Sequence, residues 1–288
     1  MTVWRTGPAL RLIGASAGPG SRIYAVRGEN RYATMEEGDA MVRRGRACVL
    51  LAALVAAGLG GCCAAYVGRV GEENAAACLI GGDLSAWRAP TGEWVLAGEV
   101  TTDPKDEKKL AWKPGTGVVV NGEAGRTNHL VSKTEHGDVE AHIEFVVPKG
   151  SNSGVYLQGR YEIQVLDSWG VQEPQYSDCG GIYQRWKDDK GYEGHPPRVN
   201  ASRPPGEWQS FDIVFRAPRF DDKGNKIENA RFVKVVHNGQ VVHENVELTG
   251  PTRASLYEDE APLGPLMLQG DHGPVAYRNV TLKKCCLD

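Results

Sequence analysis

From residue 78 onward, apolar and polar residues alternate with a period of two in several short segments. The clearest is Asp138–Val147, where Ile143 and Phe145 alternate with His142 and Glu144. This pattern is typical of a strand with one buried and one solvated face. It predicts further strands at Trp208–Phe215, Arg231–His237, Gln240–His243, Leu266–Gln269 and Val275–Leu282.

Turn signals separate these segments. Asn238-Gly239 lies between two of them and predicts a type I′ turn, which needs a positive φ at both residues. No long amphipathic helix is visible, and Asp106–Lys113 fits either a short helical turn or a solvated run of charges. Many short antiparallel strands joined by turns predict an all-β fold, a β-sandwich or jelly roll of about 200 residues.

The composition agrees with this fold class. The chain has 288 residues with 36 glycines and 16 prolines, which suits many tight turns better than a helical bundle. The formal net charge is −3 and the pI is about 6.2, so we expect no nucleic-acid partner. No repeat with a period of about 20–50 residues is visible, which argues against a solenoid or a propeller.

The first 70 residues differ from the rest. Residues 41–65 combine a positive segment (Arg43, Arg44 and Arg46) with an apolar segment at 47–59, and so predict an export signal. We expect residues 1–40, which are polar and Gly-rich, to be either a stretch upstream of the true start or a long disordered extension. Residues 66–77 then form a tether, and residues 78–288 form the β-sandwich domain.

The end of the signal is compatible with two forms of processing. Leu59-Gly60-Gly61-Cys62 resembles a bacterial lipoprotein cleavage site, in which Cys62 becomes the lipid-bearing first residue. The alternative is ordinary cleavage after Cys63-Ala64-Ala65, which releases a soluble protein. Either way we expect an exported domain in the periplasm or cell envelope, or a secreted one. Membrane contact is expected only through the lipid anchor.

The remaining cysteines fit an oxidising compartment. First and last strands of sandwich folds are often neighbours, so we expect a disulfide from Cys78 to Cys285 or Cys286. Cys179 has no candidate base near it in the sequence, and we expect it to be a buried, reduced residue.

Residues 159–170, GRYEIQVLDSWG, form a strand-like segment with an unusual number of polar groups. Because the strand period is two, Glu162 and Gln164 share a face, and Asp167 falls on the other face unless a bulge intervenes. Ile163 and Val165 are expected to face the core. A carboxylate and an amide on an apolar strand fit the lining of a polar cleft. The alternative is an ordinary solvated strand face.

Three loops add candidate groups. Asp178, next to Gly180 and Gly181, is either a second carboxylate or a turn cap. Arg198 lies between proline-rich turns and is either a binding group or a solvated side chain. His272 ends a strand and is either a proton-transfer group near neutral pH or an exposed loop histidine.

Other polar residues suggest less. We expect His136 and His142 on solvated strand faces, and no His, Asp or Glu cluster has convincing metal spacing. We predict no cofactor. Asp221–Asn225 is compatible with weak Ca²⁺ binding, but a polar hairpin turn explains it more simply.

Several stretches together resemble the bacterial 3-keto-disaccharide hydrolase family, also known as domain of unknown function 1080. The resemblance spans about residues 80–282, and its motifs occur in the family's order. They are GDLSAW (82–87), VPKGSNSGVYL (147–157), GRYEIQVLDSWG (159–170), DCGGIY (178–183), PPRVNASRPPGEWQSFDIVFRAPRF (196–220), HNG (237–239) and GPLMLQGDHGPVAYRNV (264–280).

The resemblance implies a concanavalin-like jelly roll of two curved antiparallel sheets and action on glycosides already oxidised to a ketone at C3. A C3 ketone acidifies the C2 proton, so a base could start an elimination that is completed by addition of water. Direct hydrolysis through an acid and a carboxylate partner is the competing route. The expected partner is therefore an oligosaccharide or glycoside substrate.

The segment Glu162-x-Gln164-x-x-Asp167 is also similar to the Glu-x-Asp-x-x-Glu strand of laminarinase-type glycoside hydrolases. The middle acid is an amide here, which argues against a standard double displacement. We assign catalytic roles to Glu162, Asp167 and His272. The expected substrate-binding residues are Asn152, Arg160, Gln164, Asp178, Tyr183, Arg198 and Gln269.

Two other function classes stay open. A carbohydrate-binding module without turnover would use exposed aromatic residues rather than a carboxylate-bearing cleft. An ordinary laminarinase-like glucanase would need the missing middle acid.

Overall fold

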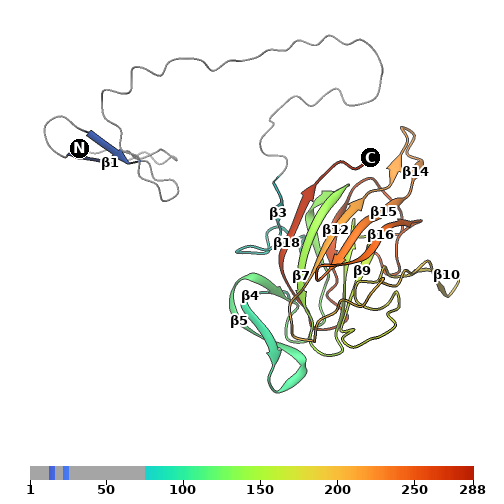
Figure 1. Cartoon of the computed structure of the whole chain (residues 1–288), viewed down its shortest axis with the longest axis horizontal. Coiled ribbons are helices and arrows are strands. Elements are labelled where there is room, and N and C mark those ends of the chain that lie inside the picture. The colour runs from blue at the N-terminus through green and yellow to red at the C-terminus, as the bar shows by residue number, and fades with distance from the viewer. Residues whose placement is uncertain (1–12, 17–21, 26–74) are drawn as a thin grey trace, which may run out of the picture. The chain divides into compact units, whose positions relative to one another are not determined.

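The computed structural model describes residues 13–16, 22–25 and 75–288 (Figure 1). The chain divides into two compact units, residues 1–66 and residues 67–288. In the first unit, β1 (Ile13–Ser16) and β2 (Arg22–Ala25) pair antiparallel. The expected export signal with Cys62, most of the tether and most of the upstream stretch lie outside the described residues.

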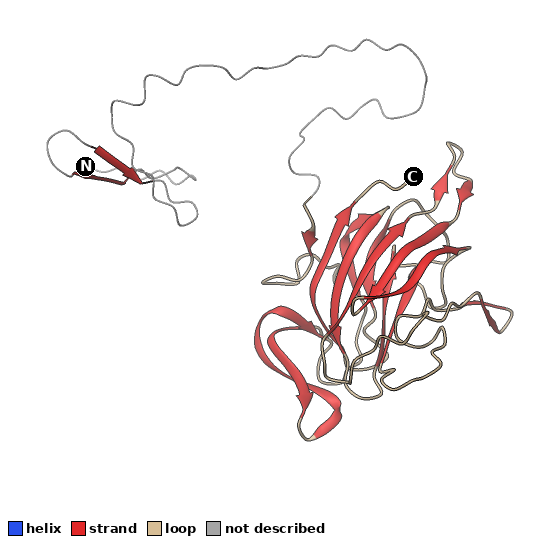
Figure 2. Ribbon diagram, in the orientation of Figure 1, coloured by secondary structure: helices blue, strands red, loops and turns tan. Residues whose placement is uncertain are grey.

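The described part of the second unit consists of strands and loops (Figure 2). Within the described ranges, no helix is long and apolar enough to cross a membrane. The larger sheet of the second unit has eight strands in the order β16-β15-β12-β7-β18-β5-β4, with β3 beside β18. These strands are β3 (Ala77–Cys78), β4 (Val95–Asp103), β5 (Asp106–Val120), β7 (Val139–Val146), β12 (Gln209–Arg216), β15 (Ala230–His237), β16 (Gln240–Leu248) and β18 (Ala276–Lys284).

A smaller sheet has four antiparallel strands in the order β6-β17-β8-β9. They are β6 (Leu130–His136), β8 (Asn152–Leu157), β9 (Tyr161–Leu166) and β17 (Gly264–Leu268). Residues 180–183 extend this sheet beyond β9, because Gly180 N–H donates to Gln164 O and Tyr183 N–H donates to Glu162 O. Two short hairpins complete the domain, β10 (Arg185–Lys187) with β11 (Lys190–Tyr192) and β13 (Arg219–Phe220) with β14 (Lys226–Glu228).

The hydrophobic core lies between the two sheets. Val155, Ile163 and Val165 of the smaller sheet belong to the same buried cluster as Ile143 and Phe211 of the larger one. Aromatic rings join the layers directly, since Tyr161 lies 5.4 Å from Phe215 between ring centroids. The inward positions follow the period-two pattern of each strand, so the predicted all-β class and the antiparallel pairing are confirmed.

Most predicted strands occur within a residue or two of their expected bounds. Asn238 and Gly239 have φ values of 49° and 82°, as the type I′ turn requires. The helical-turn interpretation of Asp106–Lys113 was wrong, because this segment forms part of β5. Leu110 is buried and pairs with Thr102 of β4, while the lysines at 108 and 109 face solvent.

The first and last strands of the domain are neighbours as expected, but the cysteines are not bridged. Cys78 pairs with Thr281 across the β3–β18 ladder, so Cys285 lies four residues further along the chain, just past the end of β18. That offset corresponds to about 13 Å, well beyond the Cα separation of about 7 Å that a disulfide tolerates. Cys78, Cys285 and Cys286 are free, which corrects the disulfide prediction. Cys179 is buried and free, as expected.

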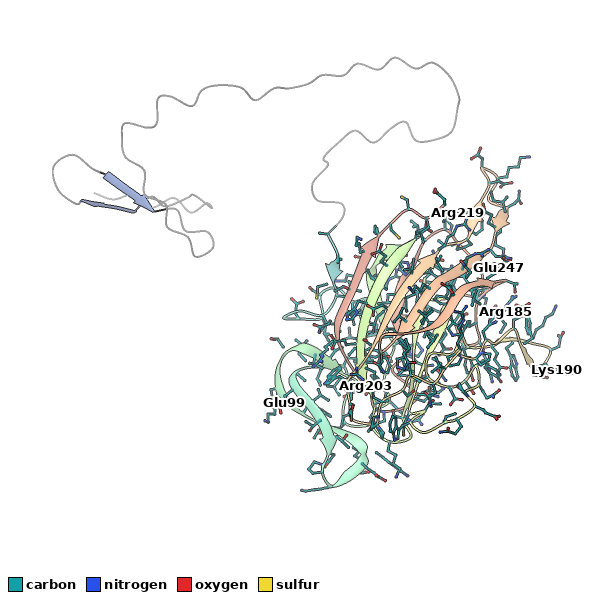
Figure 3. All side chains as sticks on the ribbon, viewed as in Figure 1. Glu99, Arg185, Lys190, Arg203, Arg219 and Glu247 are labelled. Atoms are coloured by element: carbon teal, nitrogen blue, oxygen red, sulfur yellow. The ribbon has the colours of Figure 1, made fainter. Side chains whose placement is uncertain are left out.

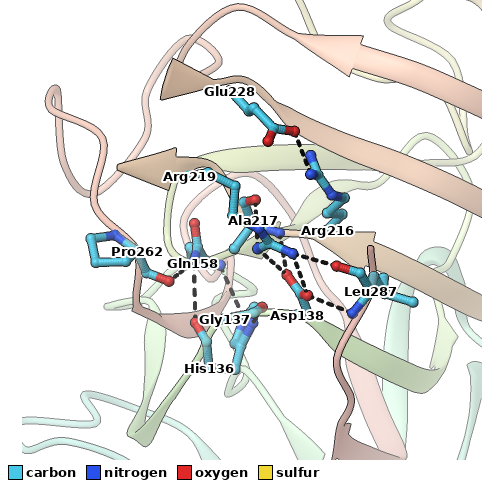
Figure 4. A network of polar contacts seen from close by, with 10 residues as sticks. All are labelled: His136, Gly137, Asp138, Gln158, Arg216, Ala217, Arg219, Glu228, Pro262 and Leu287. Carbon is cyan, nitrogen blue, oxygen red and sulfur yellow. Dashed lines mark hydrogen bonds and ion pairs between the residues drawn. The ribbon is translucent and has the colours of Figure 1, made fainter. Parts of the chain in front are cut away.

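Asp138 joins the start of β7 to two distant parts of the chain (Figure 4). Its carboxylate accepts hydrogen bonds from both terminal nitrogens of Arg219 at 2.7 Å. It also accepts the Ala217 and Leu287 backbone N–H groups at 2.8 Å. Burial alone would raise the pKa of Asp138, but these donors and the Arg219 charge outweigh it and lower the pKa.

Three buried histidines stay neutral inside the sandwich. His136 was expected on a solvated face, but it is fully buried and accepts the Gln158 N–H on Nε2 at 3.1 Å. His237 contacts Gln209 Oε1 at 2.9 Å, and His243 contacts Gly180 O at 2.7 Å. Burial lowers the pKa of His136 to about 4, of His237 to about 3 and of His243 to about 4. His142 does reach solvent, paired with Asp212 at 2.6 Å.

We predict that His237→Gln reduces the acid sensitivity of the domain. The unfolded histidine binds a proton below its ordinary pKa of 6.5, whereas the folded one resists protonation until about pH 3. As the pH falls between these values, the unfolding free energy of the wild type should decrease faster than that of the variant. The difference should be about 1.4 kcal/mol for each pH unit. Urea unfolding at pH 6.5, 5.5 and 4.5 measures this difference. Equal decreases in unfolding free energy with falling pH in the two proteins would contradict the prediction. His142→Gln, which changes a histidine that reaches solvent, serves as the control.

Candidate functional site

The β8–β9 hairpin brings a set of polar side chains onto one face of the smaller sheet. Its register places Tyr156 opposite Glu162 and Gly154 opposite Gln164. The alternate residues of both strands face the core, as predicted for Ile163 and Val165. Glu162 and Gln164 therefore point away from the core but are still only 3% and 4% exposed. They lie on the floor of a cleft rather than on a solvated surface.

Gly154 makes room for the Glu162 carboxyl group. A Cβ at position 154 would lie 2.3 Å from Glu162 Oε1, which is closer than real contacts allow. The carboxyl group therefore packs directly on the β8 backbone, in space that any larger residue at 154 would fill. Ser153 supports this backbone from the other face, since its hydroxyl donates to Gln269 O at 2.7 Å.

Burial changes the acidity of Glu162. Desolvation raises the pKa of Glu162 to about 8; a hydrogen bond from Tyr156 opposes this shift and the nearby Asp271 charge adds to it. The Tyr156 hydroxyl also lies 3.5 Å from Arg253 O. Burial, and then the adjacent Glu162, raise the pKa of Tyr156 well above its ordinary value. Glu162 is thus a carboxyl group that gains and loses its proton near neutral pH.

A cavity of about 250 Å³ opens above this floor. Polar residues from five separate segments line it, and eight of the nine lining side chains are polar. They are Asn152 and Tyr156 of β8, Glu162 and Gln164 of β9, Tyr183 of the edge segment, Arg253 and Ala254 of the loop before β17, and Gln269 and His272 after β17.

Two features of the wall favour a ligand with several hydroxyl groups. Asn152 Oδ1 is buried without a hydrogen-bond partner among the described residues, and such an atom is stabilised when a ligand donates to it. Gln164 Nε2 is held by Ser177 O at 3.2 Å, which fixes the orientation of its amide. Amides, phenols and a carboxyl group in one cavity match the alternating donors and acceptors of a sugar ring.

His272 stands at the rim of the cavity and contacts Asp271. Its Nδ1 lies 2.5 Å from Asp271 Oδ1, and the ring is half exposed. His129 lies behind the pair, with its Nδ1 3.9 Å from the same carboxylate and 3.2 Å from the Gly270 N–H. Burial lowers the pKa of His129, although Asp271 opposes the shift. The contact with Asp271 holds the His272 ring at the rim of the cavity.

The structure brings together six of the ten residues selected from the sequence: Asn152, Glu162, Gln164, Tyr183, Gln269 and His272. It separates the other four from the cavity. Arg160 is buried and holds the loop before β17, with Nη2 2.8 Å from Asp259 Oδ1. Asp167 caps the turn between β7 and β8 by accepting the Gly150 N–H at 2.8 Å.

Asp178 and Arg198 also have other partners. Asp178 accepts the Ser168 hydroxyl at 2.9 Å and the Gln175 N–H at 2.8 Å, which is the turn-capping alternative. Arg198 pairs with Glu244 at 3.1 Å beside a second cavity near Trp169. Neither residue lines the cavity that contains Glu162.

Three lining residues were missed by sequence reasoning. Tyr156 could have been found, because Asn152, Gly154 and Tyr156 alternate along β8 on the face that the hairpin register aligns with Glu162. Arg253 and Ala254 carry no such signal. They lie in a loop with no regular period, and Ala254 has a positive φ of 61° that the sequence does not announce.

The described residues contain no cluster of three or more His, Cys, Asp or Glu side chains placed to hold a metal ion. Around Asp221, the Lys223 and Asn225 N–H groups donate to Oδ1 at 2.9 and 2.8 Å. These bonds form the polar turn that was the simpler interpretation, and weak Ca²⁺ binding there stays a prediction.

Comparison with known families identifies the domain. The family model described as "3-keto-alpha-glucoside-1,2-lyase-like domain" matches residues 77–283, which is most of the chain. The chain belongs to this family. The resemblance read from the sequence motifs is thereby confirmed.

Solved structures agree with the family. A protein of Parabacteroides distasonis ATCC 8503, provisionally described as a glycosyl hydrolase, is 28% identical with a TM-score of 0.53; the match covers 73% of this chain and 84% of that one. Two more proteins of that organism with the same description are 20% and 17% identical, with TM-scores of 0.42 and 0.41. The matches cover 67% and 72% of this chain and 99% and 92% of theirs. No curated protein matches the sequence.

We predict that Glu162→Gln stabilises the domain increasingly as the pH rises from 4.5 to 8. In this window the unfolded Glu162 is ionised, whereas the folded one keeps its proton up to about pH 8. The wild type should therefore lose about 1.4 kcal/mol per pH unit relative to the variant. Chemical unfolding of both proteins across this range measures the gap. The difference in unfolding free energy between the two proteins at pH 4.5 serves as the reference. If that difference stayed the same at every higher pH, the prediction would be contradicted.

Proposed function

We propose that the cavity cleaves glycosides whose sugar carries a ketone at C3, with Glu162 as the base that removes the C2 proton. The observation that carries this proposal is a buried carboxyl group with a raised pKa on the floor of a polar cavity. A raised pKa makes a carboxylate a stronger base, which suits a carbon acid better than an ordinary exposed carboxylate does. The family and its glycosyl hydrolase relatives support a saccharide substrate.

The reaction proceeds by elimination followed by hydration. Glu162 takes the proton from C2, and the electron pair of that bond is delocalised into the C3 carbonyl as an enolate. The enolate then re-forms the ketone and expels the C1 oxygen, which takes a proton from His272. The product is an unsaturated 3-keto sugar, and addition of water across its C1–C2 bond gives the free 3-keto sugar. The amides of Asn152 and Gln269 lie where they could donate to the enolate oxygen.

Standard glycoside hydrolysis has less support. That mechanism needs two carboxyl groups on either side of the scissile bond. Among the described residues that line the cavity, Glu162 is the one carboxylate. Asp167, the other carboxylate of the strand motif, is bound to Gly150 outside the cavity. A ketone at C3 removes the need for the second carboxylate, because the enolate rather than an oxocarbenium ion carries the developing charge.

The compartment rests on the sequence of residues 41–65, which lies outside the described residues. We propose that the enzyme acts after export, in the cell envelope or beyond it, either anchored through Cys62 or released.

We predict that the full chain releases 3-keto-glucose from a 3-keto-disaccharide but not glucose from the unoxidised disaccharide. Glu162→Gln should lower kcat at least about a hundredfold. Because a base must be ionised, kcat/KM should rise with pH and level off above about 8 in His272→Gln, where no leaving-group acid titrates, and deuterium at C2 should slow the reaction. Chromatography of the products at pH 6–9 provides the measurement.

Three results would count against the assignment. Full turnover by Glu162→Gln would remove Glu162 from the mechanism. In His272→Gln, a rate that falls with rising pH would make Glu162 an acid instead of a base. Saturable binding of the keto sugar without cleavage would favour the carbohydrate-binding module.

We predict that Gly154→Ala lowers kcat about a hundredfold while the domain stays folded. The added Cβ takes the space of Glu162 Oε1 and forces the carboxyl group out of position, and displacement of a reacting group by about 1 Å costs that much. Gly82→Ala is the control, because a Cβ there meets nothing within 4 Å. Kinetics and thermal unfolding of both variants test this; unchanged turnover in Gly154→Ala would contradict the placement of Glu162.

A further inference from the structure

A tryptophan and an arginine stack face to face beside the cavity. The Arg253 guanidinium carbon lies 3.9 Å from the centroid of the Trp186 ring. Arg253 also lines the cavity that contains Glu162, so the stack extends from the cavity wall outward. Trp186 remains 43% exposed although one face of its indole is covered. A large apolar ring is thus presented to solvent beside a residue that lines the cavity.

The hairpin that carries Trp186 is built to hold it. β10 and β11 extend away from the sandwich, with Arg185 at the base and Lys190 near the tip (Figure 3). Gln184 packs against the Gly191 backbone, where any Cβ would overlap its amide. Arg185 pairs with Glu193 at 3.3 Å and stacks on Tyr192. These contacts hold an exposed indole in one place in the absence of an apolar core beneath the hairpin.

The loop that carries Arg253 is fixed to the same segment. The Arg253 N–H donates to Gln184 O at 2.8 Å, which aligns the loop with the strand that leads into β10. The guanidinium stacks on Trp186, and none of the ion pairs among the described residues involves it. Its N–H groups are therefore available to oxygen atoms of a ligand.

The size of the cavity places the leaving group outside it. Sites for small ligands usually measure about 300–1,000 Å³, and this cavity of about 250 Å³ suits a single sugar ring. A glycoside with its keto sugar above Glu162 must extend its second group past the rim. Arg253 lines the cavity on one side, and Trp186 stacks on Arg253.

We propose that Trp186 and Arg253 form the binding surface for the leaving group and select glycosides whose aglycone is a ring, either a second sugar or an aryl group. The exposed part of the indole packs on the ring, and the Arg253 guanidinium, which lies between the indole and the cavity, donates to the oxygen atoms nearest the scissile bond. An alkyl aglycone makes neither contact. This inference rests on the proposed function, because it takes Glu162 to mark the position of the keto sugar.

The test compares 4-nitrophenyl and methyl 3-keto-α-glucoside with the full chain. Trp186→Ala should raise KM for the aryl substrate about tenfold with little change in kcat, and should leave both constants for the methyl substrate unchanged. Trp186→Phe should recover most of the lost affinity, because a phenyl ring still stacks. Trp169→Ala is the matched control: Trp169 is 57% exposed but lines a different cavity, so neither substrate should respond.

Each outcome decides the proposal. Equal effects of Trp186→Ala on both substrates, or no effect on either, would overturn it. If the wild type cleaves neither glycoside, the proposed function fails, and calorimetric titration of the same two compounds tests the inference separately. A preference for the aryl compound that Trp186→Ala abolishes would then support the binding surface, and equal affinities in both proteins would refute it.

Discussion

The site depends on one constraint, the burial of a carboxyl group on the backbone of a neighbouring strand. Glu162 is almost fully covered, and the absence of a side chain at Gly154 is what lets it lie there. Burial disfavours the charged form, so the same contact that positions the group also sets its proton affinity near neutral pH. The strand register then determines the neighbours, because Tyr156 must stand opposite Glu162. Position, acidity and surroundings thus follow from a single hairpin.

The framework around this hairpin keeps it rigid. Its inward residues belong to the core between the sheets, so any shift of β9 would disturb packing against β12. Arg160, at the start of β9, ties the loop before β17 to the hairpin through Asp259. That loop brings Arg253 to the cavity. Arg160 therefore affects the site from outside it, although it touches no part of the cavity.

The sequence predicted the strands well because burial of one face imposes a period of two. The same rule placed Glu162 and Gln164 together. The ability of histidine to transfer protons near neutral pH pointed to His272, and Asn152, Tyr183 and Gln269 were selected together with the resemblance to the family. Prediction from the sequence failed where the partner of a side chain comes from a distant segment of the chain. Asp178 and Arg198 have the right chemistry, but Ser168 and Glu244 hold them elsewhere, and no local pattern encodes such contacts. Arg253 shows the reverse case, since its loop has no period and its place is set by Gln184 and Trp186.

The pairing of β3 with β18 has a mechanical consequence. Ala77 lies opposite Leu282 and Cys78 opposite Thr281, so the chain enters and leaves the sandwich at the same end of two antiparallel strands. A force that pulls these two ends apart acts across the ladder, and its hydrogen bonds would break one after another, as in a zipper. The strands that carry the cavity belong to the other sheet. Tension between the ends would therefore open β3 first and reach the cavity last.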